Sequence, residues 1–238
     1  MQAHGVRSLL MGGQACVFYG AAEFSRDTDL AIIASPANLA RLQTALDELQ
    51  AGVIAVPPFE AEYLQRGHAV HFRCEHPDVR GLRVDVMSVM RGVAPWDQLW
   101  ERRTTLSTED GAEYDLLSLP DLVQAKKTQR DKDWPMLRRL LEAHYFAHEA
   151  QATPVQIVFW FRELRTPLLL LELARRYPQE LAAHASEREV LQAVQAEAAE
   201  EEGSMTVLAQ HAAAAEAARP LTAAERFGVI EKPDLTFT

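Results

Sequence analysis

Residues 8–30 read SLLMGGQACVFYGAAEFSRDTDL, and this stretch decides the fold class. A short apolar run ends at Gly12 and Gly13, and the segment after these glycines is expected to open a helix. A second, largely apolar run extends from Thr28 to Ala34. Two apolar runs of strand length around a short helical segment indicate the first part of an α/β domain.

The alternation of strand and helix signals continues to about residue 115. Ser35 and Pro36 predict the start of a helix over 37–49, because Ser is a favoured N-cap and Pro is favoured at the first helical position. β-branched and aromatic residues between turn signals predict further strands. These are Ala69–Cys74, Leu82–Ser88, Arg103–Ser107 and Ala112–Asp115.

From residue 119 onward the strand signals stop and helical periodicity takes over. Helices are expected over 120–127, 134–149, 154–164, 167–176 and 187–201. We therefore predict two domains, an α/β domain over residues 1–115 and a helical domain over residues 116–238.

Composition narrows the class of protein. The 238 residues are 48% hydrophobic and 24% charged, which excludes wholesale disorder. With 24 Lys and Arg against 34 Asp and Glu, the net charge is −10, which argues against coating nucleic acid or a membrane by bulk charge. The N-terminus lacks a signal pattern and no apolar run is long enough to span a bilayer, so a cytoplasmic location is expected. Cys16 and Cys74 are expected to be reduced and buried.

Asp27 and Asp29 are the first candidate site residues. Alternate residues of a strand point to the same side, so the two carboxylates are expected to lie together. Their repulsion calls for a hard divalent cation, Mg²⁺ above all when the substrate carries phosphate. Gly12 and Gly13 allow close approach of the backbone and offer N–H groups to an anion at a helix start.

A third carboxylate and a basic segment complete the candidate set. Asp85 lies in an apolar strand, where a charge is costly unless it is paired or bound to metal, and sharing a metal with the first two acids would explain it. Lys126 and Lys132 belong to a basic helix end and turn that a triphosphate would suit. A basic helix end also suits the helix dipole without any ligand, and the sequence leaves both interpretations open.

Taken in order, these motifs resemble those of the nucleotidyltransferase superfamily, in particular its AbiEii-like and related prokaryotic groups. The family pattern is Gly-Gly after the first strand, Ser/Thr-x-Asp-hydrophobic-Asp on the second, and a third Asp on a later strand. The similarity covers roughly the first 140 residues, and Thr28 departs from the apolar residue usual between the paired acids. The matching residues are Gly12, Gly13, Ser25, Asp27, Asp29, Asp85 and the segment 117–133.

The resemblance implies a nucleotidyltransferase-type mixed sheet with flanking helices. It implies an enzyme that transfers a nucleoside monophosphate from a nucleoside triphosphate, such as ATP, to an acceptor hydroxyl with release of pyrophosphate. The resemblance implies two Mg²⁺ ions, or Mn²⁺ in their place, bound by Asp27, Asp29 and Asp85. It also implies that Asp85 accepts the proton of the acceptor hydroxyl. The implied phosphate contacts and charge partners are Gly12, Gly13, Ser25, Lys126 and Lys132. The acceptor stays open among tRNA, a protein and a small molecule.

Other hypotheses explain parts of the same pattern. An Asp-x-Asp pair also serves glycosyltransferases that use nucleotide sugars, although that explains neither the two glycines nor Asp85. A structural interpretation makes Asp27 a turn residue and Asp29 a surface residue. The second functional hypothesis is a catalytically silent nucleotidyltransferase-fold protein that binds a partner, as one half of a toxin–antitoxin pair.

The histidines do not predict a zinc site. His71 and Cys74 fall on opposite faces of the expected strand, so they cannot share one ion. His144 and His148 are four residues apart on an expected helix, but the glutamate of a metalloprotease motif is missing between them. These histidines are expected on the surface or in the core.

Overall fold

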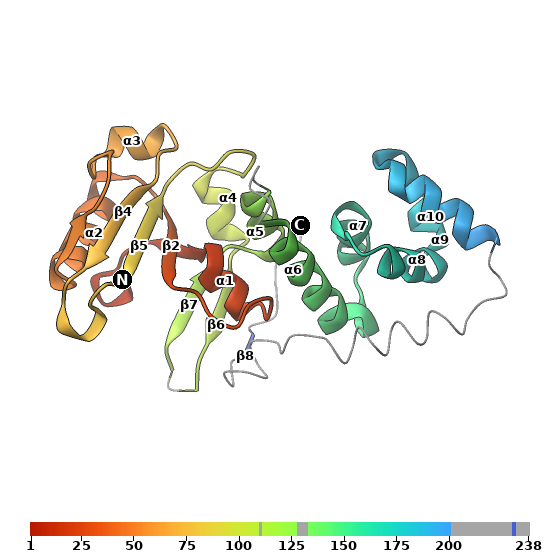
Figure 1. Cartoon of the computed structure of the whole chain (residues 1–238), viewed down its shortest axis with the longest axis horizontal. Helices are drawn as coiled ribbons and strands as arrows, with labels where there is room; N and C mark the ends of the chain where they lie inside the picture. The colour runs from red at the N-terminus through yellow and green to blue at the C-terminus, as the bar shows by residue number, and fades with distance from the viewer. Residues whose placement is uncertain (110, 128–132, 201–229, 232–238) are drawn as a thin grey trace.

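The computed structural model describes residues 1–109, 111–127, 133–200 and 230–231 (Figure 1). Their strands are β1 (Ser8–Met11), β2 (Asp27–Ile32), β3 (Ala51–Val53), β4 (Val70–Cys74), β5 (Arg83–Met87), β6 (Thr104–Ser107), β7 (Glu113–Leu116) and β8 (Ile230–Glu231). These strands form one mixed sheet in the order β3-β4-β5-β2-β1-β7-β6-β8. At its centre, β2 runs antiparallel to β1 and parallel to β5.

Helices cover both faces of the sheet and then continue away from it. In the described residues they are α1 (Gly12–Phe18), α2 (Pro36–Glu48), α3 (Ala61–Gln65), α4 (Trp96–Glu101), α5 (Leu119–Lys126), α6 (Asp133–His148), α7 (Pro154–Glu163), α8 (Pro167–Arg176), α9 (Pro178–His184) and α10 (Glu189–Glu200). Short 3-10 turns lie at Gln2–His4, Pro77–Val79, Glu149–Gln151 and Ala185–Glu187. Figure 1 shows α2 and α3 at one end of the molecule, α7 to α10 at the other, and α1, α5 and α6 between them.

Two hydrophobic clusters hold these layers together. The smaller one joins α2 and α3 to one face of the sheet, where Leu42 and Leu46 pack with Phe72 and Val84. The larger one begins on the other face and continues through the helices as far as α10. The larger core therefore crosses the predicted boundary at residue 115.

Alternation along β5 separates its apolar and charged side chains. Val84 and Val86 are buried in the smaller cluster, whereas Arg83, Asp85 and Met87 face the opposite side of the sheet. The same alternation on β2 buries Leu30 in the smaller cluster. The acids of β2 and β5 thus share the face that α1 and α5 cover.

The predicted mixed α/β fold class with a helical C-terminal region is confirmed. Ser35 caps α2 by accepting the Asn38 N–H, and Pro36 occupies the first turn, as predicted. The first helix starts at Gly12 itself, two residues before the expected start. Four short elements were not predicted, namely β3, α3, α4 and α9, and β8 adds a strand to the region expected to be wholly helical.

Two further expectations concern the cysteines and membranes. Cys16 and Cys74 are free and buried, as predicted. Burial raises the pKa of the Cys16 thiol to about 11, so that side chain behaves as a small apolar group. None of the helices that the structure describes has the length and apolar character needed to cross a bilayer.

Candidate functional site

The two glycines at the start of α1 lie directly against the acidic segment. Gly12 has φ +63°, and a Cβ there would overlap the Asp29 carboxylate. A Cβ on Gly13 would overlap the Ser25 hydroxyl. Both positions therefore need glycine because the neighbouring side chains approach the backbone so closely.

Asp29 and Asp85 are neighbours across the sheet. The parallel pairing of β2 with β5 sets Asp29 opposite Asp85 and Asp27 opposite Arg83. Burial raises the pKa of Asp29, and the charges of Asp85 and Asp27 raise it further. The Gly13 N–H, 3.4 Å from Asp29 Oδ2, opposes this shift, as does Lys126.

Asp85 is already paired with two basic side chains. Its Oδ1 lies 2.8 Å from Arg83 Nε and 2.8 Å from His71 Nδ1. The side chain of Asp85 is only 13% exposed, so these contacts compensate much of the cost of burying its charge. The contacts of Asp85 with Arg83 and with His71 are both made by the same carboxylate oxygen, Oδ1.

A cavity of about 870 Å³, which we call the Asp29 cavity, opens beside these acids. Asp29 and Asp85 lie in one wall and Lys126 and Lys127 in another. The loop after β5 adds Arg91. Acids and cations thus face one space, and its volume is within the range of small-molecule sites.

The predicted site residues fall into three groups. Gly12, Asp29, Asp85 and Lys126 line the Asp29 cavity. Gly13, Ser25 and Asp27 lie beside it, with the Ser25 hydroxyl donating to the Asp27 carbonyl oxygen at 2.9 Å. Lys132 lies outside the described residues.

Metal binding was predicted at all three acids. The described part of the chain contains no group of three or more His, Cys, Asp and Glu side chains placed to hold a metal ion. Asp29 and Asp85 nevertheless suit a cation between them, since Mg²⁺ is commonly held by one or two carboxylates together with substrate phosphates and water.

Sequence reasoning missed several residues of the site. His71 could have been found, because its strand pairs with β5 across the expected turn and this register sets His71 opposite Asp85. Arg91 and Gln124 carried no signal, because their place in the cavity depends on how a loop and α5 pack against the sheet.

Two histidines that were considered for a zinc site, His71 and His144, have other surroundings in this fold. His71 is partly exposed on β4 whereas Cys74 is buried on the other face, so they do not converge. His144 is buried and its Nδ1 accepts the Trp160 indole N–H at 2.9 Å. Burial lowers the pKa of His144 to about 3, which keeps it neutral.

No protein-family model matches the chain, and no curated protein matches it either.

Proposed function

We propose that the Asp29 cavity binds a nucleoside triphosphate with a divalent cation and that the chain is a nucleotidyltransferase of nucleotidyltransferase-type fold. The observation that carries this proposal is the register of β2 with β5, which pairs Asp29 with Asp85 at a cavity that also contains Lys126 and Lys127. Two neighbouring carboxylates favour a cation, and the lysines favour the anion that such a cation accompanies.

In this proposal the acidic residues hold the metal ion, and the basic residues and the glycines contact the phosphates. Asp29 and Oδ2 of Asp85 would hold Mg²⁺, or Mn²⁺ in its place, and Asp27 would support a second ion from the same strand. The bound metal supplies neutralisation and alignment of the phosphate oxygens for in-line displacement. Lys126 and Arg91 bind the triphosphate, and the absent side chains of Gly12 and Gly13 leave room for it.

The second candidate function is partner binding without catalysis. In this case the chain would be a catalytically silent protein that binds a partner, as one half of a toxin–antitoxin pair does. A specific observation favours it: Arg83 and His71 already occupy Asp85 Oδ1. A carboxylate already held by an arginine and contacted by a histidine has less need of a metal ion.

Calorimetric titration with each of the four nucleoside triphosphates, with and without Mg²⁺, tests binding. We expect heat with Mg²⁺ only, and Asp29→Asn should weaken the affinity at least about tenfold. Asp97→Asn is the matched control, because Asp97 is exposed in the first turn of α4. If none of the four triphosphates binds, with or without Mg²⁺, the proposed nucleotide site is refuted.

Asp85→Asn, compared with the wild type, distinguishes the two candidate functions, nucleotide transfer and partner binding without catalysis. The protein is incubated with triphosphate labelled at the α-phosphate and with a cell extract, and label is counted in the RNA, protein and small-molecule fractions. For an enzyme, the wild type labels one fraction, and Asp85→Asn binds triphosphate within about threefold of the wild type but transfers nothing. Binding without transfer by the wild type would favour the silent protein.

A further inference from the structure

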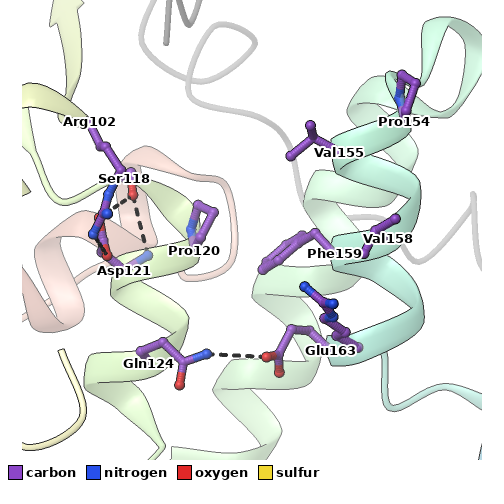
Figure 2. Close-up of a pocket in the computed structure, with 11 residues that line it drawn as sticks. Arg102, Ser118, Pro120, Asp121, Gln124, Pro154, Val155, Val158, Phe159 and Glu163 are labelled. Carbon is purple, nitrogen blue, oxygen red and sulfur yellow. Dashed lines mark hydrogen bonds and ion pairs between the residues drawn. The ribbon is translucent and has the colours of Figure 1, made fainter. Parts of the chain in front are cut away.

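A second cavity lies between α5 and α7, on the helical side of the molecule (Figure 2). It measures about 640 Å³, within the range of small-molecule pockets. Pro120 of α5 faces it from one side, and Val155 and Phe159 of α7 point into it from the other. We call it the α5–α7 pocket.

The charged residues of the α5–α7 pocket already have partners within the protein. Arg102 makes two hydrogen bonds to Asp121, at 2.7 and 3.2 Å. The side chain of Glu163 is only 8% exposed, and its Oε1 accepts from Lys127 at 2.6 Å. Glu163 Oε2 is buried, accepts no hydrogen bond from the described residues, and lies 3.8 Å from Arg165 Nη2.

Arg162, the remaining cation of the pocket, is paired in the same way. It makes two hydrogen bonds to Glu187, at 2.7 and 3.1 Å. Each charge of the pocket is thus balanced within the protein, so an ionic ligand would bring an unbalanced charge, whereas the apolar side chains are free to bind an uncharged ligand.

Gln124 connects the two cavities, because it lines both. Its Nε2 donates to Glu163 Oε1 at 3.2 Å. Since the amide nitrogen faces Glu163, the amide oxygen points away from that carboxylate, as Figure 2 shows. An amide oxygen only accepts hydrogen bonds, so a hydroxyl is a suitable partner for it.

We propose that the α5–α7 pocket binds the nucleotide acceptor, and that this acceptor is an uncharged, largely apolar small molecule whose hydroxyl reaches Gln124. This inference rests on the proposed function of the Asp29 cavity. The hydroxyl oxygen bonds to the α-phosphorus of the triphosphate while the bond from that phosphorus to pyrophosphate breaks. Pyrophosphate leaves and the hydroxyl proton passes to water.

Three probes of one shape test the charge preference of the pocket. These are 2-naphthylmethanol, 2-naphthoate and 2-naphthylmethylammonium, titrated by ligand-observed NMR. We expect the alcohol to bind at least about tenfold more tightly than either ion, because either ion would bring an unbalanced charge into a pocket whose own charges are already balanced within the protein. Equal or tighter binding of an ion would overturn the proposal.

Two matched variants locate the binding site. Val155→Arg puts a long cation into the pocket, and Val53→Arg makes the same change on β3, where the valine is 44% exposed compared with 46% for Val155. Affinity for the alcohol should fall at least about fivefold in the first and stay within about twofold in the second. Gln124→Leu should abolish the preference for 2-naphthylmethanol over its methyl ether, which cannot donate a hydrogen bond. Unchanged binding in Val155→Arg would place the probe elsewhere and overturn the proposal.

A paramagnetic ion tests the orientation of the bound alcohol. With Mn²⁺ and ATP present, the CH₂OH protons of the bound alcohol should broaden more than the distal ring protons, because the hydroxyl faces the Asp29 cavity. Uniform broadening would overturn the acceptor role. If ATP does not bind in calorimetry, the proposed function fails and the acceptor role fails with it, whereas ATP binding without binding of the alcohol refutes the α5–α7 pocket alone.

Discussion

The Asp29 cavity and the helical core treat buried polar groups in opposite ways. In the helical core, His144 accepts the Trp160 N–H, and the Tyr145 hydroxyl donates to Glu172 at 3.0 Å. In the cavity, Asp29 faces another carboxylate and accepts one long N–H contact. These two polar groups of the helical core are satisfied internally, whereas the cavity concentrates like charges at a cost in stability, which is typical of a binding site.

Gly12→Ala should have the largest effect, on stability and on binding together. A methyl group there overlaps the Asp29 carboxylate, and the positive φ adds strain of its own. We expect a loss of about 2 to 5 kcal/mol in the free energy of unfolding, together with loss of triphosphate binding. Denaturant unfolding and calorimetry measure both.

Gly5→Ala separates the effect of backbone strain at positive φ from the effect of overlap with the Asp29 carboxylate. Gly5 has φ +62°, and a Cβ there meets no atom within 4 Å. This variant should lose only about 1 to 2 kcal/mol. Equal losses in the two variants would show that contact with Asp29 does not matter at Gly12.

His144→Gln should alter the response of the helical core to acid. The unfolded chain protonates this histidine near pH 6.5, whereas the folded chain resists protonation down to a pKa of about 3. Between these values the unfolded state binds more protons, so the stability that His144 supports is complete above pH 6.5 and is lost as the pH falls towards 3. The variant should lose about 1 to 3 kcal/mol at pH 8 and respond less steeply to acid.

Thermal unfolding from pH 8 to pH 4 measures that difference. His68→Gln is the control, because His68 is exposed and lies outside the helical core. The same pH response in His144→Gln as in the wild type would contradict a buried neutral histidine.

Local patterns predicted most of the fold because most elements carry their own signals. Ser35 and Pro36 mark α2, and alternation of Val84, Asp85 and Val86 identifies β5. The missed elements are short: β3 has three residues and α3 has five. Such segments are held by packing against the sheet rather than by local periodicity, so a single sequence does not reveal them.

The candidate site was predictable where the backbone alone brings residues together. Alternation along the strand predicted that Asp27 and Asp29 share one face of the sheet. The glycines at the start of α1 lie against that face, with Gly12 in contact with Asp29. The contact of Asp85 with Arg83 depends on side-chain conformation, which no motif encodes, whereas the expected pairing of β4 with β5 could have indicated His71 as a neighbour.

Asp29→Asn should stabilise the free protein. Removing this charge relieves repulsion from Asp85 and lowers the cost of burial, in keeping with the raised pKa of Asp29. We expect a gain of about 1 to 2 kcal/mol at pH 7, measured by denaturant unfolding. At pH 3, where the Asp29 carboxyl binds a proton, the gain should shrink. A loss of stability at pH 7 would mean that the carboxylate is better satisfied than its contacts indicate.

Thr153→Ala should have the smallest effect and should be confined to the helical side. Thr153 Oγ1 accepts the Gln156 N–H, and Gln156 Oε1 accepts the Thr153 N–H, so the variant breaks a capping box at the start of α7. The loss should be about 1 kcal/mol, and Thr153→Ser should restore most of it. Affinity for triphosphate should stay within about twofold, because among the described residues α7 reaches the Asp29 cavity from its far end, where Glu163 contacts Lys127 and Gln124. A drop in affinity in Thr153→Ala that Thr153→Ser reverses would show that the first turn of α7 and the cavity are coupled along the helix, and the contrast between the two regions would then have to be abandoned.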